Sequence, residues 1–332
     1  MTRENGNGAG RNNNNRSRLI ALGALTVAAA ALAVPMMRTG RPGGVNGSRH
    51  KTSDGGYDEI NDVDYYSEIH GKGEPLLVLH GALGSIDMFG PVLPKLSRHH
   101  EVIAVDLHGH GRTALGERAI NVNEMADDMA VLMDRLGIEQ IDAFGYSLGG
   151  EVALRLAVQH PEKVRRLVLV SVPFARDGFY PEIVAIQSQI SASTADSMKD
   201  TPMFRAYSAV APDPDEFPEL LNRLGEWLRT PYDWHDDISK LSMPVMLVYG
   251  DSDMIRPEHV LRFYQLLGGG RKDAGWMREH MSQNRLAILP GLTHYDIFFS
   301  PLLARTALSF LNGEEETTNW SDLVAEQAHT SG

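Results

Sequence analysis

The stretch IDAFGYSLGG, residues 141–150, joins an apolar, β-favouring run to a helical pattern through the motif Gly-x-Ser-x-Gly. Apolar side chains continue at helical spacing through residues 151–160, until Pro161 ends the helix. A serine at so sharp a strand-to-helix turn projects its hydroxyl clear of the backbone, where a histidine can reach it. We therefore predict that Ser147 is a nucleophile held in a strained backbone conformation.

The two glycines of the motif support this interpretation. Residues two before and two after the serine lie against neighbouring backbone in such a turn, so a Cβ at Gly145 or Gly149 would clash. A chain with 32 glycines contains this motif by chance about one time in ten, so the flanking strand and helix patterns give the motif its weight.

The composition excludes several classes of function. The 332 residues are 42% hydrophobic and 22% charged, enough for a full globular core. The net charge is −12 and no Lys/Arg cluster follows the N-terminus, which argues against a nucleic-acid partner. The chain has no cysteine, so disulfides, cysteine nucleophiles and cysteine metal sites are excluded.

The N-terminal segment, residues 1–37, predicts a signal peptide or a membrane anchor. Four arginines in an Asn/Gly-rich lead precede the uncharged run 19–34. Small residues at Ala31 and Ala33 offer a cleavage site, yet the apolar character extends to Met37, close to the length of a spanning helix. On either interpretation the domain is exported, as a periplasmic or secreted protein or one attached to the membrane. Residues 38–54 resemble a flexible linker.

From residue 57 onward, short β-rich runs alternate with helical patterns. This alternation predicts an α/β fold with a mostly parallel central sheet flanked by helices. We expect the core to span residues 55–172 and 241–312, a helical cap to be inserted at 173–240, and residues 313–332 to form a polar tail. The expected strands are 63–69, 76–80, 102–106, 141–144, 167–172, 245–249 and 286–289, and the expected core helices are 86–96, 122–136, 148–160, 258–267 and 301–311.

Four motifs together resemble the α/β-hydrolase fold, over about residues 57–311. They are HGALGS at 80–85, DLHGHGRT at 106–113, the Gly-x-Ser-x-Gly motif, and GDSDMIRP at 250–257 followed by PGLTH at 290–294. The resemblance implies the order Ser, Asp, His along the chain, with His294 as general base. It favours Asp253 over Asp251 as the acid, because Asp253 lies three residues after a glycine and four before a proline.

The same resemblance implies how the negative charge of an acyl-transfer transition state is met. The backbone N–H of Leu148 follows the nucleophile, and the N–H of Ala82 follows the His-Gly pair, so these two groups form the expected oxyanion hole. We interpret His80, His108 and His110 as residues that hold loops by hydrogen bonding.

The expected function is hydrolysis of a carboxylic ester through an acyl-enzyme on Ser147, without metal or organic cofactor. A serine at the elbow disfavours dehalogenase and epoxide-hydrolase chemistry, since both need a carboxylate there. Lactone hydrolysis, C–C bond hydrolysis, cofactor-free perhydrolysis and a non-catalytic ligand-binding role remain open. The expected partner is a small-molecule ester, and the sequence does not indicate an oligomeric state.

Overall fold

A single mixed sheet forms the centre of the computed structural model, which describes residues 55–313 and residue 320. The strands are β1 (Gly56–Ile60), β2 (Val63–His70), β3 (Glu74–Leu79), β4 (His100–Val105), β5 (Ile141–Tyr146), β6 (Val164–Val170), β7 (Val245–Ser252) and β8 (Arg285–Thr293). Their order is β1-β2-β4-β3-β5-β6-β7-β8. The β1–β2 and β2–β4 pairs are antiparallel and the others are parallel, which confirms the predicted mostly parallel sheet.

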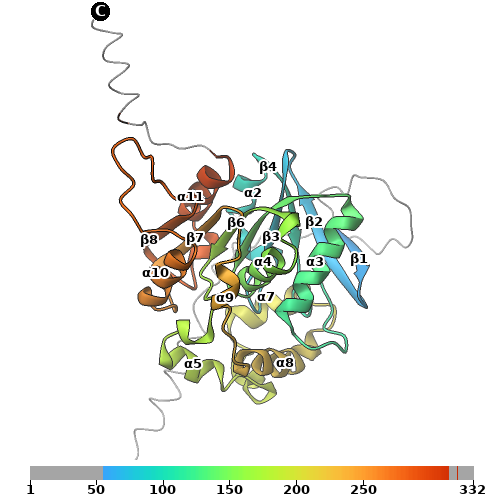
Figure 1. Ribbon diagram of the computed structural model, residues 1–332. Helices are drawn as coiled ribbons and strands as arrows, with labels where there is room; N and C mark the ends of the chain where they lie inside the picture. Colours follow the sequence, from blue (N-terminus) through green and yellow to red (C-terminus); the bar gives the residue numbers. More distant parts are fainter. Residues whose placement is uncertain (1–54, 314–319, 321–332) are drawn as a thin grey trace, which may run out of the picture.

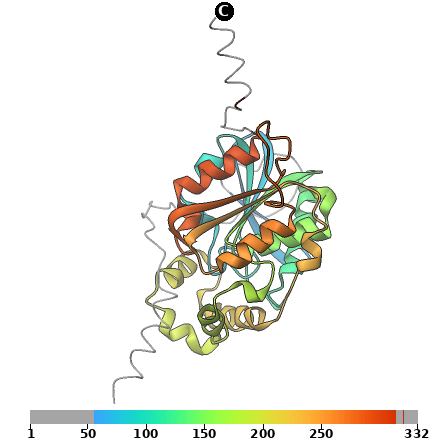
Figure 2. The same cartoon turned by 60° about the vertical axis from the view of Figure 1, so that its left-hand side comes forward.

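Helices cover both faces of this sheet (Figure 1). One face carries α3 (Val122–Leu136), α4 (Leu148–Gln159) and α10 (Pro257–Leu266), and the other carries η1 (Ile86–Phe89), α2 (Leu93–Leu96), η6 (Ile297–Phe299) and α11 (Pro301–Leu311). Figure 2 shows α10 and α11 on opposite sides of the strands. Strand residues alternate between the two resulting cores, because successive side chains of a strand point to opposite faces. In β3, Leu77 and Leu79 join one core while Leu76 and Val78 join the other.

The predicted helix at 86–96 is wrong in one respect, because the structure divides it into η1 and α2. Gly90 and Pro91 lie at the break, and the Gly90 N–H bonds back to the Asp87 carbonyl to close η1. Proline has no N–H to continue a helical ladder and restricts the residue before it. The α3 and α11 bounds coincide with the predicted ones.

Strand β1 was not predicted, and it adds an antiparallel edge through a tight turn. Asn61 and Asp62 form this turn with φ values of 48° and 66°. Two successive positive φ values are typical of the short turns that join hairpin strands, and Asn and Asp tolerate them. The Asn-Asp pair beside the Val63 strand is the signal that could have identified the hairpin.

The chain leaves the sheet after β6 and returns to it at β7. The intervening elements are η3 (Arg176–Gly178), α5 (Pro181–Gln187), η4 (Ala192–Thr194), α6 (Ala195–Met198), α7 (Pro202–Val210), η5 (Pro214–Glu216), α8 (Phe217–Arg229) and α9 (His235–Ile238). Figure 1 shows α5 and α8 together beyond one end of the sheet. We call this segment the cap. The chain enters and leaves the cap through two segments that lie side by side. Ala175 bridges Asp233, and the Trp234 N–H donates to the Phe174 carbonyl at 2.9 Å.

The predicted signal peptide or anchor, the linker and most of the polar tail lie outside the described residues. Within residues 55–313, no helix has the length and apolar content needed to cross a membrane.

Candidate active site

Ser147 occupies the sharp turn between β5 and α4. Its backbone has φ 51° and ψ −121°, an unfavourable conformation for a residue with a Cβ, and its N–H donates to the Val170 carbonyl at 2.9 Å. A Cβ at Gly145 would lie 2.4 Å from the Gly149 carbonyl oxygen, and one at Gly149 would lie 2.4 Å from that of His80. The turn therefore requires both glycines and carries the backbone strain that the motif predicts.

A chain of hydrogen bonds connects the serine to a histidine and a carboxylate. The His294 Nε2 atom lies 3.1 Å from Ser147 Oγ, and its Nδ1 atom lies 3.0 Å from Asp253 Oδ1. Asp251 points elsewhere, because its Oδ2 accepts the Gly291 N–H at 3.0 Å. The structure thus brings Ser147, His294 and Asp253 together from three separate strand ends. Asp251 takes no part in this series of hydrogen bonds.

The surroundings of Asp253 keep it ionised. Its side chain is only 2% exposed, and this burial raises the pKa. The neighbouring His294, the Ser171 hydroxyl and the Gly250 N–H outweigh burial, so the pKa of Asp253 lies below its usual value. An ionised carboxylate beside Nδ1 holds the imidazole in the tautomer whose Nε2 can accept a proton from the serine.

Two residues that the sequence analysis missed support this arrangement. The Tyr146 hydroxyl donates to the His294 carbonyl at 2.6 Å, and the two rings are tilted against each other with centroids 5.2 Å apart. The Ser171 hydroxyl donates to Asp253 Oδ2 at 2.5 Å from the end of β6, where its φ is 55°. Tyr146 occupies a variable position of the Gly-x-Ser-x-Gly motif and Ser171 lies outside the motifs, so no motif specifies either residue type.

The two residues expected to form the oxyanion hole, Ala82 and Leu148, belong to segments next to the serine. Leu148 follows Ser147 at the first position of α4, where an N–H has no acceptor within the helix. The loop that holds Ala82 also approaches closely, because a Cβ at Gly81 would lie 3.3 Å from Ser147 Cβ. Among the described residues, neither N–H is paired with an acceptor.

His80, His108 and His110 lie in the loops beside this site and act as hydrogen-bonding residues. The Leu107 N–H donates to His80 Nε2 at 3.0 Å, while His108 donates to the Leu115 carbonyl at 2.7 Å and His110 Nδ1 donates to the His108 carbonyl at 2.9 Å. Burial lowers the pKa of His80 and His108 to about 4 and that of His110 to about 3. All three are therefore neutral at pH 7.

The motif at 106–113 locks a second loop in place. Asp106 is fully buried and accepts the N–H groups of Ile86 at 2.7 Å and Arg112 at 2.8 Å. The Thr113 hydroxyl donates to the Asp106 carbonyl and accepts the Tyr66 N–H. These bonds tie the loop after β4 to the segment that follows Ala82.

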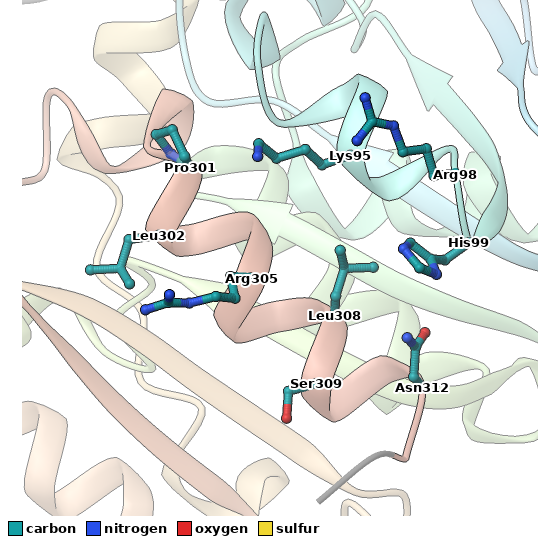
Figure 3. A pocket seen from close by; sticks show the side chains of 9 residues that line it. All are labelled: Lys95, Arg98, His99, Pro301, Leu302, Arg305, Leu308, Ser309 and Asn312. Atoms are coloured by element: carbon teal, nitrogen blue, oxygen red, sulfur yellow. The ribbon is translucent and has the colours of Figure 1, made fainter. Parts of the chain in front are cut away.

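A separate hollow of about 540 Å³ lies between α2 and α11 (Figure 3). It is lined by Lys95, Arg98, His99, Pro301, Leu302, Arg305, Leu308, Ser309 and Asn312. Since no member of the serine–histidine–aspartate chain lines it, this basic hollow is a different feature of the molecule. No group of three or more His, Asp or Glu side chains in the described part of the chain is arranged to hold a metal ion.

Comparison with known proteins identifies the family. Residues 74–199 match the model of the alpha/beta hydrolase fold family. A pimeloyl-(acyl-carrier protein) methyl ester esterase of Neisseria meningitidis serogroup B is 31% identical over 241 residues, which cover 67% of this chain and 88% of the relative. The chain belongs to the α/β-hydrolase fold family.

Further relatives and structures agree with this assignment. A candidate carbamate hydrolase of Azorhizobium caulinodans is 28% identical over 66% of this chain and 87% of its own length. The meta-cleavage product hydrolase of Pseudomonas fluorescens IP01 superposes with a TM-score of 0.62 at 21% identity, covering 77% of this chain and 97% of that one. The curated relatives are hydrolases, which supports hydrolase chemistry for this α/β-hydrolase, and the structural likeness shows the shared fold.

Proposed function

We propose that this α/β-hydrolase is a serine hydrolase that cleaves a carboxylic ester through an acyl-enzyme on Ser147. The observation that carries the proposal is the single hydrogen-bonded chain from Ser147 through His294 to Asp253. Because the serine is held on a strained turn with a buried base and acid behind it, its hydroxyl is prepared for nucleophilic attack.

In the first half-reaction, His294 Nε2 takes the Ser147 proton while Oγ bonds to the ester carbonyl carbon. The carbonyl π electrons move to oxygen, and Asp253 stabilises the imidazolium through Nδ1–H. When the tetrahedral intermediate collapses, the imidazolium gives its proton to the departing alkoxide. In the second half-reaction, His294 deprotonates water, which attacks the acyl carbon, and Ser147 recovers its proton as the acid leaves.

The negative oxygen of each tetrahedral intermediate would be bound by the unpaired N–H groups of Ala82 and Leu148. Two fixed donors beside the nucleophile stabilise charge where it develops, and losing one such donor commonly costs about 3 kcal/mol of transition-state stabilisation. These are backbone groups, so substitution of the Ala82 side chain by another small residue would leave them in place.

The ester class is favoured because the Neisseria relative is named as a methyl ester esterase. Lactone hydrolysis, C–C bond hydrolysis and perhydrolysis use the same serine, histidine and aspartate, and a ligand-binding protein without turnover would retain the fold. The structure of a meta-cleavage product hydrolase resembles that of this chain, but the sequence identity is so low that the likeness supports the shared fold and not a shared substrate. Ester hydrolysis is therefore the first activity to measure.

The test is p-nitrophenyl butyrate hydrolysis by the full chain, compared between wild type, Ser147→Ala and the control Ser239→Ala. Ser239 is an exposed serine after α9, so its variant is expected to keep the wild-type rate. We expect Ser147→Ala to lose about 10³-fold or more in kcat/KM. A wild-type preparation without turnover, or a Ser147→Ala variant that retains the rate, would contradict the proposal.

A further inference from the structure

Helix α4 presents a buried carboxyl that the proposed mechanism does not use. Glu151 lies one helical turn after Ser147, on the same face of α4, and is 6% exposed. It accepts a hydrogen bond from the Tyr232 hydroxyl at 2.9 Å, and the Trp227 side chain is a second hydrogen-bonding neighbour. Both partners belong to the cap, so this carboxyl connects the helix of the proposed nucleophile to the cap.

Helix α4 makes a second contact with the segment through which the chain returns from the cap to the core. One turn further along α4, Arg155 pairs with Asp237 at 2.7 Å, and its guanidinium lies 5.3 Å from the centre of the Trp234 ring. Glu151 and Arg155 therefore contact successive parts of residues 232–237, which we call the return leg. Arg155 is partly open to water, whereas Glu151 is sealed inside.

Aromatic rings enclose the Glu151 contact. The Trp227 and Tyr232 rings are stacked with centroids 6.0 Å apart and an interplanar angle of 11°, and Tyr232 stacks on Trp234 at 4.4 Å. A carboxyl in such surroundings is costly unless its hydrogen-bond partners stay in place. The position of the return leg and the solvation of Glu151 are therefore coupled.

We propose that Glu151 is a positioning residue, a latch through which α4 holds the return leg and with it the cap, and that ionisation of Glu151 loosens this latch. The cap contact does not depend on the proposed function, but its consequence for substrates rests on that function. A latch one turn behind Ser147 sets where the cap lies relative to the serine, and thereby how long an acyl chain the enzyme accepts.

The sign of the pH effect follows from the environment of the carboxyl. Burial raises the pKa of Glu151 to about 7, and the Tyr232 and Trp227 side chains and the Arg176 charge only partly oppose this shift. Asp177 acts on the same cluster through Tyr232. Opening the cap admits water to Glu151 and returns the pKa of its carboxyl toward the ordinary value of about 4.5. The stabilisation of the closed cap by Glu151 is therefore complete below about pH 4.5 and is lost as the pH rises from there to about 7.

Hydrogen–deuterium exchange of the full chain tests the latch without using activity. We expect the α8 amides to exchange about fivefold faster in Tyr232→Phe and Glu151→Ala than in wild type, the loss expected for one hydrogen bond. The matched control is Glu226→Gln, which neutralises an exposed carboxyl on α8 itself. The α8 amides of this variant should exchange as in wild type. Unchanged α8 exchange in both folded latch variants would overturn the proposal.

Glu151→Gln tests the ionisation step, because glutamine fills the same space and cannot lose a proton. After correction for intrinsic rates, wild-type α8 should be less protected at pH 8 than at pH 5.5, and the difference should vanish in Glu151→Gln while persisting in Glu226→Gln. An equal pH dependence in both variants would overturn the titration of Glu151 as the cause.

Kinetics with two esters test the consequence for substrates. For Tyr232→Phe we expect a KM for p-nitrophenyl octanoate raised about fivefold, and a kcat for p-nitrophenyl acetate within about twofold of wild type. Equal loss on both esters would overturn the role in substrate size. If the wild type cleaves neither ester, the proposed function fails, while the exchange measurements still decide whether the latch exists.

Discussion

Ser171 illustrates how a residue without a motif supports the proposed chemistry. It directly follows β6 with a positive φ of 55°, and its hydroxyl lies 2.5 Å from Asp253 Oδ2. The turn directs the hydroxyl at a carboxylate that the proposed mechanism requires to stay ionised and fixed. Ser171 is therefore a positioning residue that acts through Asp253.

We predict that Ser171→Ala lowers kcat about tenfold while KM changes little, because a hydrogen bond to a charged group contributes about 1.5 kcal/mol. Steady-state kinetics on p-nitrophenyl butyrate measures this split. Ser252→Ala, at the exposed serine that ends β7, is the control. The role assigned to Ser171 is wrong if Ser171→Ala and Ser252→Ala have the same kcat.

A second residue-scale prediction separates the two aspartates after β7. We expect Asp253→Asn to lose about 10⁴-fold in kcat, since the amide favours the wrong tautomer of His294. Asp251→Asn should remain within about threefold of wild type, because among the described residues its carboxylate accepts hydrogen bonds only from the Gly291 N–H and the Ser252 hydroxyl. Comparison of the two kcat values at pH 7 measures this, and the opposite ranking would refute the assignment of Asp253.

The sequence indicates the residues of the proposed catalytic chain far better than the residues that support them. Ser147 lies in a local motif, and His294 and Asp253 follow from chain order and from the turn residues around them. The contacts of Ser171 with Asp253 and of Tyr146 with His294 join residues 82 and 148 positions apart. Such contacts depend on sheet order and strand register, which no local pattern of these residues reveals.

At the scale of elements, the edge hairpin shows where pattern reasoning stops. Residues of β1 alternate weakly in burial and include Asp58 and Glu59, which are poor strand formers. The strand forms because its partner β2 is anchored to α3. Asp128 of α3 accepts the Tyr65 hydroxyl at 2.6 Å and the Asn61 amide at 2.7 Å, and pairs with Arg118.

We predict that Asp128→Ala lowers the free energy of unfolding by about 3 kcal/mol, because the variant leaves the buried Tyr65 hydroxyl and the partly buried Arg118 guanidinium without this acceptor. Urea unfolding at pH 7 measures the change. The neighbouring Asp127 is a half-exposed residue that pairs with His160, so Asp127→Ala should cost about 0.5 kcal/mol or less. Equal losses in the two variants would show that the hairpin does not depend on Asp128.

At the scale of the whole molecule, neutral buried histidines make the fold sensitive to acid. Burial lowers the pKa of His80, His108 and His259 to about 4 and that of His110 to about 3. These residues bind protons near pH 6.5 when unfolded but resist protonation when folded, so stability is lost as pH falls from 6.5 toward 4. Glu151, with its raised pKa, acts in the opposite sense.

We predict that the free energy of unfolding falls by several kcal/mol between pH 7 and pH 4.5, since four histidines outweigh one glutamate. Urea unfolding at pH 7, 6, 5 and 4.5 measures the slope. His110→Gln should reduce the slope by about one bound proton, because His110 Nε2 has no partner among the described residues and its protonation is strongly resisted. Equal stability at pH 7 and pH 4.5 would refute the prediction.

The bridge between Ala175 and Asp233 has a consequence for how such a protein can diversify. The chain leaves and re-enters the core at neighbouring points, and no strand of the central sheet comes from the described residues between them. Recombination at this junction would replace the whole cap by another one and leave Ser147, His294 and Asp253 unchanged. The cap, and with it substrate preference, could then evolve independently of the core that carries the proposed chemistry.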